Sequence, residues 1–517
     1  MNGAESLVRT LVAGGVNVCF TNPGTSEMHF VAALDRVEGM RCVLGLFEGV
    51  ITGAADGYAR MADKPASTLM HLGPGLGNGL ANLHNAKKAS SPIVNIVGEH
   101  ATYHIRHEAP LTADIEGIAR PVSAWVRTSA DAKSVAADGA EAIAAARTAP
   151  GRIATLILPA DTAWNPADGI ARVAAPAPRV RVSEIAIKNA AKVLRSGEAT
   201  ALLLTGMALR ERPLELAGRI ATKTGAKVLV QGSNARLQRG AGRVPVGRIP
   251  YVVDQALEML KGFRHIILIE AKEPVAFFAY PDKPSLLLPK GCEAHRLAEL
   301  GEDSLHALEW LSDELGATRE DPRAQPRAET ALPSGALNLD SIAKVIGALI
   351  PENAIVVDES ITTGRGFFPF TAGAPPHDWL QNMGGSIGYG PPVGTGAAIA
   401  CPDRKVLCLE GDGSAMYTVQ SLWTQARENL DVTTVVFANR SYQILKGELA
   451  SVGAGNPGRK ALDMLDIDRP GLDWVLLAKS MGVDAVRVAT ADDFGKALGG
   501  AIRERGPRLI EVQMYKA

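Results

Sequence analysis

The sequence predicts an α/β protein of three domains, each built around a doubly wound parallel sheet. Short apolar runs alternate with segments of helical periodicity through almost all of the 517 residues, which is typical of parallel strands joined by helices. A chain of this length is also too long for a single hydrophobic core. Two stretches rich in proline and alanine, 166–184 and 316–335, lack that periodicity and indicate linkers. We therefore expect domains at about 1–165, 183–318 and 336–517.

The first domain shows the alternation most clearly. Apolar runs predict four strands, at 16–24, 40–46, 65–72 and 91–100. The segments between them predict helices at 48–62 and 75–89. The helix at 48–62 is rich in glycine and alanine, so one of its faces is expected to approach a neighbouring element closely.

The central domain carries fewer motifs. Its apolar runs predict strands at 202–210, 226–232 and 263–271. It contains no G-x-G-x-x-G, so the sequence does not indicate a bound dinucleotide there.

The third domain returns to a clear alternation. Strands are expected at 354–360, 404–411, 432–439 and 507–514, and a glycine-rich stretch occupies 382–398. A helix is expected between the second and third of these strands, because apolar residues there trace one helical face: Val419, Leu422, Trp423, Ala426 and Leu430.

Composition excludes several classes of function. The formal net charge is −1 and no basic run occurs, so neither nucleic acid nor an anionic membrane is an expected partner. No stretch of eighteen uncharged apolar residues predicts a membrane span, and the N-terminus does not resemble a secretory signal. The five cysteines are scattered without a C-x-x-C, which favours reduced thiols and a cytoplasmic protein over a zinc site.

Two strand ends in the third domain bring polar residues together. Asp412, in the sequence Gly411-Asp412-Gly413-Ser414, follows one strand, and Asn439 follows the next strand, 27 residues later. A strand, a helix and a strand of this length form a right-handed crossover, so the two strands are parallel. Both residues therefore lie at the carboxyl edge of the sheet, where open α/β sheets bind ligands.

The residue types at this edge suit a metal ion and a phosphate. Asp412 offers a carboxylate, Asn439 an amide oxygen, and Ser441 a backbone carbonyl. These hard oxygen donors are too few for a closed cage and suit Mg²⁺ or Ca²⁺ completed by phosphate oxygens and water. The helix that starts at Ser414 would turn free N–H groups toward the same anion. A lone Gly-Asp-Gly is more often a plain turn, whereas this spacing indicates a metal–diphosphate site.

This spacing resembles the motif of enzymes that use thiamine diphosphate. Other segments resemble the acetolactate synthase and benzoylformate decarboxylase group of that family, in the same order along the chain: NPGTSE (22–27), FEGVITGAADGYAR (47–60), GPGLGNGLANLHNAKKASSPIVNIVGE (73–99) and GGSIGYGPPVGTGAA (384–398). The resemblance covers nearly the whole chain and is weakest in the central domain. It implies pyrimidine-binding, central and diphosphate-binding domains, with thiamine diphosphate and Mg²⁺ as cofactors and no FAD expected.

The resemblance also implies roles for individual residues. Glu48 matches the cofactor-activating glutamate, although a glutamate at a helix start also favours the helix dipole. Ile387 matches the apolar wedge under the cofactor, and the carbonyl of Gly385 would accept from its amino group. Ser360 and Thr362 would reach the diphosphate, unless they are ordinary caps. Further cofactor contacts are expected from Gly411, Gly413, Ser414 and Tyr442.

The substrate side of the resemblance is less uniform. His71 matches an active-site histidine, and the other candidates are Thr25, Leu111 and Leu445. Phe277 and Phe278 stand where a second histidine is expected, and Glu448 where an aromatic residue is expected. These departures favour a small aliphatic 2-oxo acid over an aromatic one.

The resulting hypothesis is a thiamine-diphosphate-dependent lyase or carboligase that acts on a 2-oxo acid as a homodimer or homotetramer. Three alternatives remain open. They are a benzoylformate decarboxylase-like enzyme that does not ligate, a flavin-containing synthase or oxidase, and a cofactor-binding paralogue without turnover.

Overall fold

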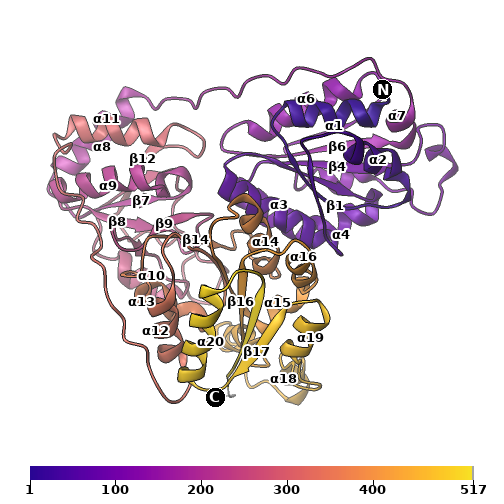
Figure 1. The fold of residues 1–517 in the computed structure, drawn as a ribbon. Coiled ribbons are helices and arrows are strands. Elements are labelled where there is room, and N and C mark those ends of the chain that lie inside the picture. Colours follow the sequence, from indigo (N-terminus) through magenta and orange to yellow (C-terminus); the bar gives the residue numbers. More distant parts are fainter. Residues whose placement is uncertain (515–517) are drawn as a thin grey trace.

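The computed structural model describes residues 1–514, which form three parallel-sheet α/β domains (Figure 1). The predicted fold class is therefore confirmed. An extended segment crosses from the first domain to the central domain, and a second one descends from the central domain to the third (Figure 1). Residues 165–183 and 315–338 contain no helix and no strand of a sheet.

The first sheet has the strand order β2-β1-β3-β4-β6-β5, and all of its strands are parallel. Its strands are β1 Val18–Asn22, β2 Arg41–Leu44, β3 Ala66–Met70, β4 Ile93–Glu99, β5 Trp125–Thr128 and β6 Ile153–Pro159. Its helices are α1 Gly3–Ala13, α2 Met28–Arg36, α3 Glu48–Ala62, α4 Leu72–Lys88, α5 Ile115–Ala119, α6 Val135–Arg147 and α7 Ala160–Trp164. Strands β3, β4 and β6 are buried throughout, as their continuous apolar runs require.

The central sheet has the order β10-β8-β7-β11-β12 and is also parallel. Its strands are β7 Thr200–Leu204, β8 Lys227–Val230, β10 Gly247–Arg248, β11 His265–Ile269 and β12 Glu293–Ala298. Its helices are α8 Glu184–Arg195, α9 Glu211–Thr224, α10 Val253–Leu260 and α11 Ser304–Glu314. The strand expected at 202–210 ends early at Leu204, because Gly206 takes a φ of 61° and starts a 3-10 turn.

The third sheet has the order β17-β18-β16-β15-β13-β14-β9. Its strands are β9 Leu237–Arg239, β13 Ile355–Glu359, β14 His377–Gln381, β15 Val406–Gly411, β16 Val432–Ala438, β17 Asp484–Val488 and β18 Arg508–Gln513. Its helices are α12 Leu339–Leu349, α13 Phe367–Phe370, α14 Gly390–Ala400, α15 Asp412–Ala415, α16 Ser421–Arg427, α17 Gln443–Ser451, α18 Arg459–Asp463, α19 Trp474–Ser480 and α20 Ala491–Arg503. Strand β9 comes from the segment assigned to the central domain and pairs antiparallel with β14.

The helical segment after Asp412 differs from the single helix that the sequence predicts. It is divided into α15, a 3-10 turn at Met416–Thr418, and α16. At the break, the Thr418 hydroxyl donates a hydrogen bond to the carbonyl of Gly388, at 3.0 Å. This tertiary contact turns the segment toward the glycine-rich loop, and periodicity along the chain does not reveal it.

Helices α3 and α14 join the first and third domains through a close contact. A Cβ on Gly57 would lie 2.1 Å from the carbonyl oxygen of Val393, and one on Gly396 would lie 1.8 Å from that of Ala54. Glycine is therefore required at both positions for the two backbones to meet. The glycine-rich face expected on the helix at 48–62 serves this contact, and one hydrophobic core spans both domains.

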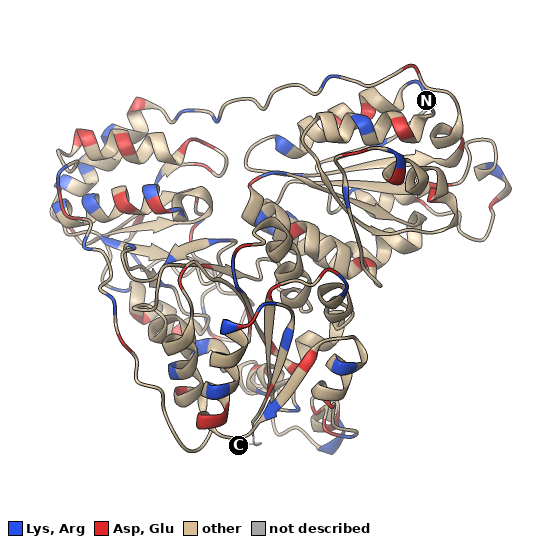
Figure 2. Cartoon of the chain, in the orientation of Figure 1, with Lys and Arg blue, Asp and Glu red and all other residues tan. Residues whose placement is uncertain are grey.

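Charged residues of both signs are interspersed over the outer helices of all three domains (Figure 2). Within residues 1–514, no helix has the length and apolar character needed to cross a membrane. The five cysteines are all free.

Candidate active site

The predicted site residues fall into two groups. The first group, Thr25, Glu48 and His71, follows β1, β2 and β3 at the carboxyl edge of the first sheet. Glu48 and His71 both lie near Gly75, whose Cβ, if present, would be 3.2 Å from Glu48 Oε1 and 3.4 Å from His71 Cβ. Leu111 is half-buried and packs against the hydrophobic core beside this group.

Glu48 is the first residue of α3, and its side chain is buried. The Nδ2 of Asn78, on α4, donates a hydrogen bond to Glu48 Oε2 at 3.0 Å. Within residues 1–514 no Lys, Arg or His forms an ion pair with this carboxyl group. Among these residues, an amide rather than a cation therefore orients the Glu48 carboxyl group.

His71 is oriented by a residue that the sequence analysis did not assign. Its Nδ1 lies 2.9 Å from Oε2 of Glu27, whose side chain is buried. The backbone N–H of Gly24 donates to the same Glu27 oxygen at 2.7 Å, which fixes the carboxylate. A carboxylate on Nδ1 favours a proton there and leaves Nε2 for proton exchange.

The NPGTSE segment contains Glu27, but nothing in the sequence indicates that His71 is its partner. The two residues meet because β1 and β3 are neighbours in register, with Asn22 opposite Met70. The order of strands in the sheet supplies that adjacency.

The second group lines one large cavity of about 1420 Å³ at the carboxyl edges of the central and third sheets. It contains all the predicted cofactor and metal residues of the third domain, together with Leu445: Ser360, Thr362, Gly385, Ile387, Gly411, Asp412, Gly413, Ser414, Asn439, Ser441 and Tyr442. Thr25, Glu48, His71 and Leu111 do not line this cavity in the same chain.

Asp412 has the features of a cation ligand. Its side chain is 3% exposed, and within residues 1–514 it forms no ion pair. Burial raises the pKa of Asp412 to about 6, although N–H groups of Arg440 and Gly413 donate to its two oxygens at 2.6 and 2.9 Å. A buried carboxylate without a compensating charge is stabilised by a bound cation.

The surroundings of Asp412 also fit a metal–diphosphate group. Asn439 follows β16, and its Oδ1 accepts from the N–H of Ser441 at 2.9 Å, which orients the amide. Gly413 is pressed against the Tyr442 ring, so a Cβ at 413 would lie 2.4 Å from that ring. The donors are carboxylate, amide and carbonyl oxygens, which are the donors that Mg²⁺ takes in proteins. The residues present therefore fit the expected group.

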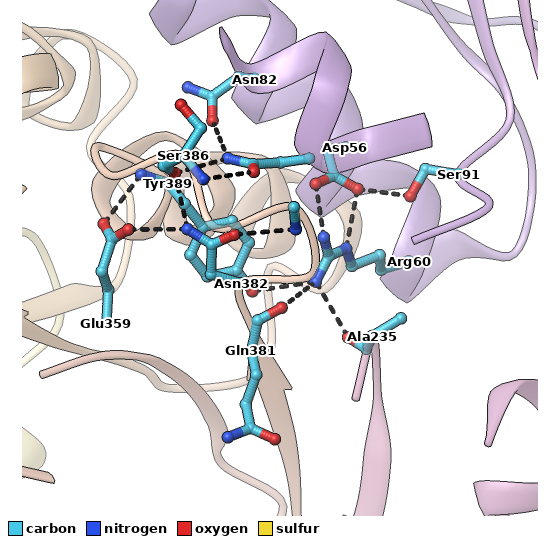
Figure 3. Close-up of polar contacts among 12 residues, drawn as sticks. Asp56, Arg60, Asn82, Ser91, Ala235, Glu359, Gln381, Asn382, Ser386 and Tyr389 are labelled. Atoms are coloured by element: carbon cyan, nitrogen blue, oxygen red, sulfur yellow. Dashed lines mark hydrogen bonds and ion pairs between the residues drawn. The ribbon is translucent and has the colours of Figure 1, made fainter. Parts of the chain in front are cut away.

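The glycine-rich loop that carries Gly385 and Ile387 is held by buried hydrogen bonds from two domains (Figure 3). From α4, Asn82 donates to the carbonyl of Gly388 at 3.1 Å, and Asn85 donates to that of Ser386 at 2.8 Å. From β13, Glu359 accepts from the N–H groups of Tyr389 and Gly390, at 2.8 and 2.9 Å.

Arg60 connects this loop to α3. It forms a bidentate pair with Asp56, at 2.8 and 2.7 Å, and both side chains are almost fully buried. Its remaining nitrogen donates to the carbonyl of Gln381 at 2.8 Å and to the Tyr389 hydroxyl at 3.0 Å (Figure 3). Asp56, Arg60 and Glu359 were not predicted. Arg60 reaches Gln381 and Tyr389 in the third domain, and Glu359 reaches a loop of its own domain that is about 30 residues away along the chain.

Two fully buried acids lie under the loop. Burial raises the pKa of Glu359 to about 7. Burial, together with the charge of the neighbouring Glu359, raises the pKa of Glu410 well above its usual value. The backbone N–H groups of Tyr389 and Gly390, which donate to Glu359, oppose the effect of burial on the pKa of Glu359.

Another part of the cavity lining comes from α17 and the central domain. Glu448 accepts a hydrogen bond from the Tyr251 hydroxyl at 3.0 Å. The Phe277 ring packs against Tyr251, with centroids 5.5 Å apart, and a Cβ on Gly385 would lie 2.9 Å from Phe277. Phe277 and Glu448, which both depart from the family pattern, therefore contact the same residue, Tyr251.

Two family models match the chain. The model described as the N-terminal TPP binding domain of thiamine pyrophosphate enzymes matches residues 1–118, and the model described as their C-terminal TPP binding domain matches residues 365–512. The "Putative acetolactate synthase large subunit IlvX" of Mycobacterium tuberculosis is 54% identical over 99% of both chains.

More distant similarities include one decarboxylase sequence and one solved decarboxylase structure. Benzoylformate decarboxylase of Pseudomonas aeruginosa is 29% identical over 96% of both chains. The structure of Rhodococcus jostii RHA1 thiamine diphosphate-dependent 4-hydroxybenzoylformate decarboxylase superposes with a TM-score of 0.85 over 100% of both chains, at 25% identity. The chain belongs to the thiamine pyrophosphate enzyme family and is a thiamine-diphosphate-dependent enzyme related to acetolactate synthase and benzoylformate decarboxylase.

Proposed function

We propose that this enzyme uses thiamine diphosphate and Mg²⁺ to decarboxylate a small aliphatic 2-oxo acid and to join the acyl fragment to a second carbonyl compound. The observation that carries this proposal is the buried, uncompensated Asp412 beside Asn439 and Ser441, in the same cavity as Ile387 and Leu445. Asp412, Asn439 and the carbonyl of Ser441 would hold Mg²⁺, and Ile387 would support the cofactor from below. When bound, thiamine diphosphate supplies a nucleophilic carbon and an electron sink for chemistry next to a carbonyl.

Assembly is part of the proposal, because the two groups of site residues do not share a cavity within one chain. Glu48 would hold a proton at the pyrimidine ring of a cofactor bound by a second chain, so a homodimer would be the smallest active unit. Two such dimers would form the alternative homotetramer.

Complementary variants test this assembly. Glu48→Gln and Asp412→Ala homodimers should each be inactive. Random mixing should restore about a quarter of the sites, because half of the dimers are mixed and each of these has one intact site of two. Inactivity of mixed dimers that size-exclusion and mass analysis show to have formed would contradict a shared site.

The part of the cavity lining that carries Tyr251 and Glu448 favours a small substrate. Phe277 and Leu445 narrow the cavity with apolar surface, while the Tyr251–Glu448 hydrogen bond occupies the position where an aromatic pocket residue is expected. An aromatic ring at this wall would have to break that hydrogen bond or leave a carboxylate against apolar carbon. Benzoylformate is therefore expected to be a poor substrate.

Product analysis of the holoenzyme tests the reaction. Incubation with pyruvate, and with pyruvate plus an aldehyde, should give ligated products, whereas benzoylformate should turn over slowly. Rapid release of benzaldehyde from benzoylformate without a ligated product would refute the proposed substrate class.

The Glu27–His71 pair favours a second candidate, a decarboxylase that releases a free aldehyde. An oriented imidazole could supply the proton that the missing second histidine supplies in related decarboxylases. The same experiment separates the two candidates, because this one gives acetaldehyde alone from pyruvate.

A further inference from the structure

A cluster of histidine and glutamate side chains lies outside the candidate active site, at the amino ends of β11 and β12. His265 begins β11 and pairs in register with Glu293, the first residue of β12. His295 pairs with Ile267, two residues further along β11. Because alternate residues of a strand share a face, His265, Glu293 and His295 lie on one face of the central sheet.

The distances in this cluster match those expected of ligands that share one metal ion. His265 Nδ1 lies 3.0 Å from His295 Nε2, and His295 Nε2 lies 3.8 Å from Glu293 Oε2. One ligand atom from each of the three residues lies within 4.8 Å of the other two. The histidines are partly buried, while Glu293 is 71% exposed, so an ion from solution has a path to the cluster.

A fourth side chain sets the orientation of His265. Glu198, which precedes β7, accepts from His265 Nε2 at 2.8 Å. This hydrogen bond places the imidazole proton on Nε2 and leaves the lone pair of Nδ1 directed at His295. Ligating histidines commonly donate their other N–H to a carboxylate in this way.

We propose that His265, His295 and Glu293 bind a transition-metal ion of the Zn²⁺ class. Two imidazole nitrogens and one carboxylate oxygen suit Zn²⁺, Ni²⁺ or Cu²⁺, whereas Mg²⁺ prefers oxygen donors alone. Three protein ligands leave a coordination position for water. The site is thus chemically distinct from the all-oxygen set at Asp412.

The position of the site points to a structural role. Strand β12 is an edge strand of the central sheet and is joined to the rest of the sheet only through β11. The candidate active-site cavity is lined by Glu270, which follows the carboxyl end of β11, and by Leu300, which follows that of β12, whereas the cluster lies toward the amino ends of these strands. A metal ion here would pin the edge strand to its neighbour without contacting the substrate.

Calorimetric titration of the Mg²⁺- and thiamine diphosphate-loaded enzyme with Zn²⁺ tests the proposal. Wild type is expected to bind one equivalent of Zn²⁺ per chain that the His265→Ala/His295→Ala variant does not bind. Glu198→Ala, which leaves all three ligands in place, should weaken this binding by about 10-fold. His306→Ala removes an imidazole from the same domain but outside the cluster, and should bind Zn²⁺ like wild type.

Two further measurements test the proposal even if the double variant misfolds. Added Zn²⁺ should raise the unfolding temperature of wild type and of His306→Ala, because a ligand that binds only the folded state stabilises it. Electron paramagnetic resonance of Cu²⁺ added to wild type should show coupling to two imidazole nitrogens. Equal Zn²⁺ stoichiometry in wild type and the double variant, or a Cu²⁺ spectrum without nitrogen coupling, would show that the cluster is only a hydrogen-bonded chain.

Discussion

The two walls of the active-site cavity are held in different ways. Loop 381–390 is fixed by buried hydrogen bonds from α3, α4 and β13, and Arg60 alone gives it two (Figure 3). In α17 and α18, all of which the structure describes, no residue is buried. That wall has partly buried side-chain contacts, such as Tyr251–Glu448 and Lys446–Asp466 at 3.0 and 2.7 Å, and a backbone bond from the Tyr442 N–H to the Leu465 carbonyl at 2.8 Å. From this comparison we infer that the loop wall, proposed to lie under the cofactor, is rigid and that the α17 wall, proposed to meet the substrate, is adaptable.

The largest expected effect comes from breaking the rigid wall at Arg60. Arg60→Met should leave Asp56 as a buried carboxylate without a cation, and should free the Tyr389 hydroxyl. Loss of one partner of a buried ion pair costs about 3–5 kcal/mol of folding free energy. We expect a marked fall in the urea midpoint of the first transition, followed by circular dichroism.

A matched control separates this effect from the loss of any arginine. Arg36→Met breaks an exposed pair with Glu5, and exposed pairs contribute only ~0–1 kcal/mol. If the two variants unfold at the same urea concentration, the network around Arg60 does not hold the loop.

The second effect concerns binding rather than folding. Asp412→Ala should abolish measurable binding of Mg²⁺ and thiamine diphosphate by calorimetry, since one of few proposed ligands is lost. The apo protein should unfold at the same or a higher temperature, because burial raises the pKa of Asp412 to about 6 and its charge is costly at pH 7. Asp403→Ala, on an exposed turn, is the control. Unchanged cofactor affinity in Asp412→Ala would contradict a metal site at the carboxyl edge of the third sheet.

The third effect concerns chemistry, with both walls intact. Glu48→Gln should bind the cofactor as wild type does, because glutamine has nearly the same size as glutamate and its amide oxygen can still accept the hydrogen bond from Asn78. It should slow exchange of the C2 proton of the bound cofactor by roughly 10²–10⁴-fold, the range for a lost acid–base group. Proton exchange followed by NMR after acid quench measures this directly. A wild-type exchange rate would leave Glu48 with only a structural role.

The sequence predicts some residues of the candidate site but not the residues that orient them. Asp412, Asn439 and Ser441 were predictable together, because the handedness of a strand–helix–strand crossover places consecutive strand ends at one edge. Glu27, Arg60 and Glu359 were not, since each acts on a residue brought near by strand order or by the contact of α3 with α14. Periodicity also failed where Thr418 bonds to Gly388 and divides the predicted helix. Local pattern thus identifies the candidate ligands, and tertiary adjacency determines what orients them.

The smallest effect is expected at the adaptable wall. Tyr251→Phe removes the hydroxyl that holds Glu448 but keeps the ring against Phe277. A hydrogen bond of this kind is worth about 1 kcal/mol, so kcat/KM for a 2-oxo acid should change by less than about tenfold, with a shift in preference toward larger acids. Cofactor affinity should not change, because loop 381–390 keeps its buried partners. Tyr280→Phe, which leaves the 3.0 Å Tyr251–Glu448 hydrogen bond in place, is the matched control. If Tyr251→Phe instead weakens cofactor binding while leaving the substrate preference unaltered, the two walls are coupled and the division between a rigid and an adaptable wall is wrong.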